Sequence, residues 1–237
     1  IGRLSGENIK WFGGFEYMNN KLDTVDVDNI NEGKDENKMI PYSGGGLYGR
    51  YIKWGLIDPE QADGGQAGVF KAGVKYDTRD NEANPMKGLW TDIQLLFSPG
   101  FISDGFSYAR MAFTHRQYFT LLPKRINLCY RISYQAKIGG EMPFYMLPLV
   151  YNSAPQLTLS GLGGSRTIRG ILRNRVVGED FVYGNIELRW KVARTVLFNQ
   201  NLYLALSGYA DAGMVTGKYR LPETNDPEAI EWLAKGE

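Results

Sequence analysis

The chain has 237 residues and a formal net charge of +1, so its overall charge gives no reason to expect a nucleic-acid partner. Hydrophobic residues make up 43% of it, yet no run of about 18 apolar residues occurs, which excludes a helical membrane protein. A transmembrane β-barrel stays open, because only alternate residues of its strands meet lipid.

Stretches of alternating apolar and polar residues predict seven β-strands. The clearest is 126–138, where every second residue from Ile126 onward is apolar or aromatic. Several stretches are longer than ten residues, which fits strands of the roughly 9–11 residues needed to cross a membrane better than the roughly 5–6 usual in soluble proteins. The predicted strands are 7–19, 68–80, 88–98, 106–121, 126–138, 181–192 and 201–216.

The connections between these strands differ in length. Short ones fall at 81–88, 122–125 and 194–200, whereas two long ones span about 20–67 and 139–180. Loops of that size count against a compact soluble domain, but they are expected at the external end of an outer-membrane barrel.

Three segments outside the strands have predictions of their own. Residues 47–56 predict a short helix or a strand, because their pattern is ambiguous. The acidic tract 23–38 is interpreted as a solvated loop. The last twenty residues read as a loop with one helical turn.

The predicted strand 181–192 separates two kinds of residue. One face holds Tyr183, Asn185, Glu187, Arg189 and Lys191, and the other holds Val182, Gly184, Ile186, Leu188, Trp190 and Val192. A glycine-rich loop with four arginines, at 166, 169, 173 and 175, precedes this strand. An arginine-rich loop before a strand with charges on one face predicts a barrel with a polar lumen and an apolar outside.

Five motifs stand in order along the chain. They are KYDTRDNEANPMKG (75–88), GEMPFY (140–145), GLGGSRTIRG (161–170), GNIELRW (184–190) and YADAG (209–213). The ordered set resembles the BamA/TamA outer-membrane assembly and two-partner-secretion transporter superfamily. The resemblance implies an all-β fold, an antiparallel transmembrane β-barrel of the outer-membrane type. The family barrel has sixteen strands, so the seven predicted here would form its middle-to-late part, and 1–237 would be a partial barrel domain.

The resemblance also implies roles for particular residues. In this family a long loop tucks into the lumen around an arginine-glycine pair, which here is Arg169 and Gly170. The arginine pairs with acidic residues on the two following strands, by motif match Glu187 and Asp211. The alternation of polar residues agrees, because both carboxylates fall on the polar face of their strands. Arginine suits this role because its planar fork can reach two carboxylates.

The resemblance also concerns the glycines of this loop, and the loop departs from the family pattern at one position. Gly163 and Gly164, like Gly170, are expected to let the backbone pass close to the wall. Ile171 stands where the family usually has an aromatic residue, which leaves open what packs against the loop. The family's strand-and-turn signature corresponds here to Asp77, Arg79, Asp80, Pro85 and Gly88.

The sequence predicts no catalytic residues, no metal and no cofactor. The glycine-rich loop lacks the GK[ST] of a phosphate-binding loop, and the acidic stretch DVDNINEG lacks the pattern of a calcium-binding EF-hand.

Three functions are considered. The first is assembly or insertion of outer-membrane proteins, or polypeptide translocation across the outer membrane of a Gram-negative bacterium. The second is a passive solute pore. The third is a structural subunit of a larger envelope complex that docks through the acidic loop. The resemblance favours the first, with membrane lipid, client outer-membrane or secreted polypeptides and other envelope assembly subunits as partners, and no nucleic acid.

Overall fold

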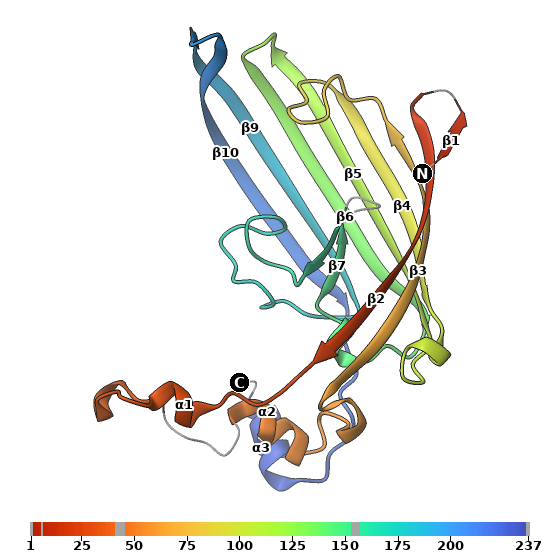
Figure 1. The fold of residues 1–237 in the computed structure, drawn as a ribbon, viewed down its shortest axis with the longest axis vertical. Helices are drawn as coiled ribbons and strands as arrows, with labels where there is room; N and C mark the ends of the chain where they lie inside the picture. The colour runs from red at the N-terminus through yellow and green to blue at the C-terminus, as the bar shows by residue number, and fades with distance from the viewer. Residues whose placement is uncertain (1, 6, 41–45, 153–156, 236–237) are drawn as a thin grey trace.

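The structure is a computed structural model that describes residues 2–5, 7–40, 46–152 and 157–235 (Figure 1). Over these residues, eight strands form one antiparallel sheet in the order β1-β2-β3-β4-β5-β6-β9-β10. These are β1 (Gly2–Ser5), β2 (Ile9–Lys21), β3 (Gly64–Asp77), β4 (Gly88–Ser98), β5 (Tyr108–Leu122), β6 (Ile126–Gly140), β9 (Asp180–Leu197) and β10 (Gln200–Gly217). A separate hairpin joins β7 (Leu149–Asn152) to β8 (Leu157–Ser160).

The prediction of an all-β fold with seven long antiparallel strands is confirmed. The predicted strands correspond to β2 to β6, β9 and β10, and the strand predicted at 88–98 coincides with β4. The structure adds β1 and the β7–β8 hairpin, whose strands of four residues are too short to show an alternation.

The helix predicted within the last twenty residues was too short, and the ambiguous segment 47–56 is helical as far as Lys53. Three helices lie outside the sheet, all within the described residues: α1 (Val27–Asn31), α2 (Gly46–Lys53) and α3 (Pro227–Lys235). The nine residues of α3 exceed the single turn expected. Its start is fixed by Asp226, whose carboxylate accepts from the N–H groups of Glu228 (2.9 Å) and Ala229 (3.3 Å).

Short 3₁₀ turns complete the elements. They are η1 (Glu36–Lys38), η2 (Pro59–Gln61), η3 (Gly100–Ile102) and η4 (Phe144–Met146).

The two faces of the sheet reverse the pattern of a soluble protein. The inner, concave face buries polar side chains, among them Asp92, Gln94, Arg110, Thr114, Asn127, Ser133 and Gln135. The outer face exposes large apolar side chains, among them Trp11, Phe15, Phe70, Val74, Ile93, Leu95, Ile132, Ile186, Leu188 and Leu206. A soluble monomer rarely exposes so continuous an apolar surface, whereas a barrel wall in lipid requires one.

The two ends of the sheet differ as the connection lengths predict. Tight turns join β5 to β6 and β9 to β10 at one end, and the helices and long connections lie at the other (Figure 1). We call these the short-turn end and the loop end. In the described part of the chain, no helix combines the length and apolar character needed to cross a membrane.

At the loop end, α2 and α3 form a small aromatic cluster. The ring of Trp232 lies 5.4 Å from that of Tyr51 and 5.8 Å from that of Trp54. Thr224 donates a hydrogen bond to the carbonyl of Trp54 (2.5 Å). The connection between β2 and β3 is thereby joined to the segment that follows β10.

The connection between β6 and β9 does not extend into solvent but lies across the inner face (Figure 1). Its first part packs into a buried cluster with β3, β4 and β5, whose members include Met142, Tyr145, Met146, Leu147 and Tyr151 from the connection, and Val69, Leu96, Tyr108 and Ala112 from the wall. Burial of this apolar surface holds the connection against the sheet.

Candidate functional site

The site is built around the second part of that connection, residues 161–179, which we call the lumen loop. Arg169 makes its main contacts with Asp211 of β10. The Asp211 carboxylate accepts from Nε (2.7 Å), from Nη2 (2.7 Å) and from the backbone N–H of Arg169 (2.8 Å). The Asp211 side chain is only 2% exposed, so the pair is shielded from water on the carboxylate side. This two-pronged geometry fixes both the position and the direction of the arginine.

Two further groups on the wall surround the guanidinium of Arg169. Its Nη1 lies 3.4 Å from Oε2 of Glu187, a weaker contact than that with Asp211. Glu187 also accepts from Nε of Arg189 (3.1 Å), so this carboxylate is shared between two arginines. The ring of Tyr209 lies 3.5 Å from Cζ of Arg169, at the distance of a cation–π contact. The structure therefore brings Arg169, Glu187 and Asp211 together.

The wall also reaches into the loop through Arg131 of β6. Its Nη2 donates to the carbonyls of Arg166 (2.8 Å) and Thr167 (3.2 Å), while its Nε donates to the side chain of Asn185 (2.7 Å). The amide of Asn185 donates to the same Thr167 carbonyl (2.7 Å). Two arginines therefore hold the loop tip. Arg169 of the loop binds a carboxylate of the wall, and Arg131 of the wall binds backbone carbonyls of the loop.

The loop tip has a defined internal fold. The hydroxyl of Thr167 accepts from the N–H of Gly163 and donates to the carbonyl of Gly163, both at 2.8 Å. Gly163, with φ of +106°, sits where an added Cβ would lie 2.3 Å from the carbonyl oxygen of Leu172. Glycine is therefore required at 163 by both backbone and space. Gly164 and Gly170 also have positive φ, but no atom lies within 4 Å of an added Cβ there.

The packing residue that the sequence left open is Ile168. Ile168 is 2% exposed and belongs to a cluster with Val150, Leu162, Phe181 and Tyr183, whereas Ile171 is 38% exposed. Ile168 is next to the arginine in sequence, and nothing in the local pattern distinguishes it from Ile171. It lies over Gly213 of β10, where an added Cβ would be 2.6 Å from its Cδ1.

Gly213→Ala is expected to lift the lumen loop from the wall. The new methyl group would also lie 2.9 Å from Cβ of Tyr183, so overpacking should cost about 1–3 kcal/mol. Gly208→Ala on the same strand is the matched control, since no atom lies within 4 Å of its added Cβ. The measurement is trypsin cleavage of the loop in each variant, and equal rates for the two would contradict the packing described here.

A buried arginine holds the base of the connection. Arg110 of β5 is fully buried, and its guanidinium donates to the carbonyls of Met146 (3.3 Å), Leu149 (3.4 Å) and Glu179 (3.3 Å). Lys137 of β6 pairs with the carboxylate of Glu179 at 2.5 Å. These contacts fix the points where the connection enters and leaves the inner face.

The strand-and-turn signature lies at the short-turn end. Arg79 donates from Nε and Nη2 to the two carboxylate oxygens of Asp77, both at 2.9 Å, and its Cζ lies 4.2 Å from the ring centroid of Trp90. Gly88 begins β4 with φ of +97°, and an added Cβ would lie 2.3 Å from the carbonyl oxygen of Thr78. This end of the signature is a compact structural unit.

The rest of the signature shapes the turn between β3 and β4. The Asp80 carboxylate accepts from the N–H groups of Met86 (2.9 Å) and Lys87 (3.2 Å). The carbonyl of Pro85 accepts from the buried amide of Asn127 (3.2 Å). Because Asn127 belongs to β6, the turn folds over the inner wall of β5 and β6.

Asp80→Ala is expected to loosen this turn. Partial burial would raise the pKa of Asp80, but the N–H donors of Met86 and Lys87 outweigh it, so its pKa lies below the ordinary value. The carboxylate therefore stabilises the turn above its unfolded pKa, and that contribution is lost as pH falls through its folded pKa. The loss in Asp80→Ala should be about 1 kcal/mol, as for other side chains that cap backbone N–H groups.

The measurement is amide hydrogen exchange at Met86 and Lys87. Exchange at neutral pH should be faster in Asp80→Ala than in the wild type, with Glu82→Ala, an exposed carboxylate of the same turn, as control. Equal protection in Asp80→Ala and the wild type would mean that these hydrogen bonds do not hold the turn.

Across the described residues, no three His, Cys, Asp or Glu side chains are grouped so that they could hold a metal ion.

A family comparison agrees with this architecture. The model of the Omp85 superfamily domain matches residues 14–228, so this chain belongs to the Omp85 superfamily, the group that includes the BamA, TamA and two-partner-secretion barrels. A search of curated proteins gave no match.

Membership settles the class of protein. Omp85 barrels are non-enzymatic, reside in the bacterial outer membrane, and either assemble outer-membrane proteins or translocate polypeptides. The resemblance drawn from the five ordered motifs is therefore confirmed. The expected location in the outer membrane and the prediction that the protein is not an enzyme agree with the family as well.

Proposed function

We propose that this barrel assembles client outer-membrane proteins or translocates polypeptides, and that docking of the lumen loop through Arg169 is needed for that activity. The observation that carries the proposal is the Arg169–Asp211 contact. It places three donors of one residue on one buried carboxylate, which fixes both the position and the direction of the arginine of the loop. A preorganised contact of this kind suits a loop whose position matters to the work of the barrel.

A passive solute pore is the weaker candidate. The lumen loop and the β7–β8 hairpin lie across the inner face, where an open channel would need free space. A structural subunit that docks through the acidic tract 23–38 has less support, because members of the superfamily assemble outer-membrane proteins or translocate polypeptides.

We also propose that residues 1–237 form part of an outer-membrane barrel domain, with the long connections near 20–67 and 139–180 at its external end and the second of them folded across the inner face. Over the described residues, β1 and β10 are the two edges of the sheet and do not pair with each other. In a bilayer every backbone group of a spanning strand needs a partner, so further strands are expected to complete the wall.

The test is depletion of the full-length protein in cells, followed by complementation with the wild type or with Arg169→Ala. Broad loss of outer-membrane proteins, or of one secreted polypeptide, on depletion supports the proposal. Loss of a single solute uptake with normal outer-membrane protein levels would support the pore instead. Full complementation by Arg169→Ala would show that docking of the lumen loop through Arg169 is not needed for the activity.

A further inference from the structure

The hairpin of β9 and β10 continues past the end of β6 at the short-turn end. The pairing of β9 with β6 ends at Trp190 and Ile126, followed only by a bond from the N–H of Lys191 to the carbonyl of Arg125 (2.8 Å). From 193 to 197, β9 pairs with β10 alone, and Val192 lies at a bulge in that pairing. Since β6 turns away here into β5, this part of β9 is a free edge within the described chain.

The end of the free edge, next to the turn, is exposed and apolar. Val196 is 66% exposed and Leu197 is 51% exposed. The two turn residues are Phe198 and Asn199, with φ of +49° and +58°. Asparagine is common in such a turn, but a bulky residue with positive φ is strained, and Phe198 is 89% exposed. Strain and exposed apolar area at one projecting tip are typical of a binding element.

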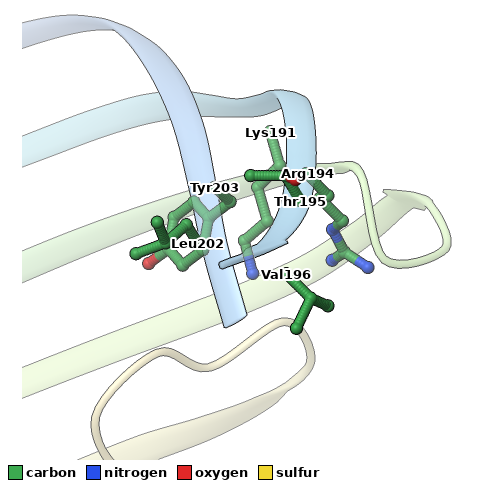
Figure 2. Close-up of a pocket in the computed structure, with 6 residues that line it drawn as sticks. All are labelled: Lys191, Arg194, Thr195, Val196, Leu202 and Tyr203. Carbon is green, nitrogen blue, oxygen red and sulfur yellow. The ribbon is translucent and has the colours of Figure 1, made fainter. Parts of the chain in front are cut away.

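A groove of about 390 Å³ lies beside this edge. It is lined by Lys191, Arg194, Thr195 and Val196 of β9 and by Leu202 and Tyr203 of β10 (Figure 2). Two of these side chains are cations, and none is acidic. The ammonium of Lys191 lies 5.0 Å from the ring centroid of Tyr203. The lining therefore joins positive charge, an aromatic ring and aliphatic surface.

Two neighbouring turns hold the groove in place. The amide of Asn84, in the turn between β3 and β4, donates to the hydroxyl of Tyr203 (3.2 Å). The guanidinium of Arg194 donates to the carbonyl of Lys124, in the turn between β5 and β6. Neither contact neutralises a charge, so the groove remains cationic.

We propose that this groove and the free edge of β9 bind an extended polypeptide segment that carries an acidic side chain beside apolar ones. The unpaired backbone groups of 193–197 would hydrogen-bond to the segment and add it as a third strand, whereas a lipid has no strand to pair there. Lys191 and Arg194 would bind the carboxylate, and Val196 and Leu202 the apolar neighbours. The inference rests on the proposed function, for which it names a docking site at the short-turn end.

The experiment measures peptide binding to the full-length protein in detergent micelles. The probe is a fluorescent peptide of about five residues, the length of the free edge, that alternates valine or threonine with glutamate. Lys191→Gln/Arg194→Gln should weaken its binding roughly tenfold. The matched control is Arg50→Gln/Lys53→Gln, which removes an exposed arginine and lysine of α2 at the loop end and should bind like the wild type.

A second measurement tests the edge. A photoreactive residue at Val196 should crosslink to the glutamate peptide, and a lysine version of the peptide should not react. Equal affinity of the double variant and the wild type would overturn the proposal. So would displacement of the peptide by anionic phospholipid without any crosslink at Val196, which would make the groove a lipid headgroup site.

The two proposals fail separately. Arg169→Ala should bind the peptide normally, because the partners of Arg169, namely Asp211, Glu187 and Tyr209, do not line the groove. If that variant loses activity while no form of the protein binds the peptide, the docking site is wrong and the proposed function stands. If depletion leaves outer-membrane and secreted proteins unaffected, the proposed function fails whatever the peptide does.

Discussion

Arg169→Ala is expected to release the lumen loop from the wall and to reduce the activity of the barrel. The substitution leaves the carboxylate of Asp211, 2% exposed, without its main partner. Breaking a buried charge pair from one side costs about 3 kcal/mol or more, which corresponds to roughly a hundredfold more of the undocked loop. The loop then becomes accessible to proteases, because cleavage follows the population of the open form.

Trypsin provides the measurement, since Arg173 and Arg175 are exposed cleavage sites within the loop. Arg166→Ala is the control, because it removes an exposed arginine of the same loop and leaves those two sites intact. Asp211→Ala should match Arg169→Ala, and the double variant should be little worse than either, as expected for two residues that act as a pair. Wild-type protease resistance with wild-type activity in Arg169→Ala would refute this prediction.

Arg110→Met is expected to have an effect of similar size at the base of the connection. The substitution keeps most of the buried volume but leaves the carbonyls of Met146, Leu149 and Glu179 without this donor. Each buried group left unsatisfied costs about 1–3 kcal/mol, so the total loss should be about 3 kcal/mol or more. The loss of stability in Arg110→Lys should be smaller than in Arg110→Met but still measurable, because an ammonium cannot span three carbonyls as the guanidinium does.

The control for Arg110 is Thr114→Val on the same face of β5. Thr114 is buried, and its hydroxyl bonds to that of Ser133 on β6 (3.0 Å), so this hydrogen bond lies within the wall. The thermal midpoint of the folded barrel and trypsin cleavage of the loop are measured together. Arg110→Met should change both, and Thr114→Val should lower only the midpoint. Unchanged cleavage in Arg110→Met would show that Arg110 supports the wall and not the loop.

Much of the wall could be predicted from the sequence, because a strand repeats every two residues and lipid imposes the same rule on each. The alternation around Glu187 places it on the inner face without knowledge of any other strand. The short alternations of β1 and β7 carry too few repeats to be seen, and the length of α3 depends on a cap at Asp226 and on packing against Trp54.

The candidate site was only partly predictable for a different reason. The alternation shows which residues of a strand face the lumen, but it does not show which of them a loop will contact. Arg131 and Asn185 were therefore visible as inward-facing residues, and their bonds to the carbonyl of Thr167 were not. The burial of Ile168 in place of Ile171 depends on the space above Gly213, which no local pattern records.

The aromatic cluster of α2 and α3 has a mechanical consequence for the sheet. It joins the connection between β2 and β3 to the segment that follows β10, the strand at the far edge. The two sides of the sheet are therefore held together at the loop end. At the opposite rim, a hydrogen bond from Asn84 to Tyr203 joins the turn between β3 and β4 to β10. Spreading of the wall is therefore opposed more strongly at the loop end. If Trp54 and Trp232 stay in contact while the sheet widens, the strands must separate more at the short-turn end than at the loop end.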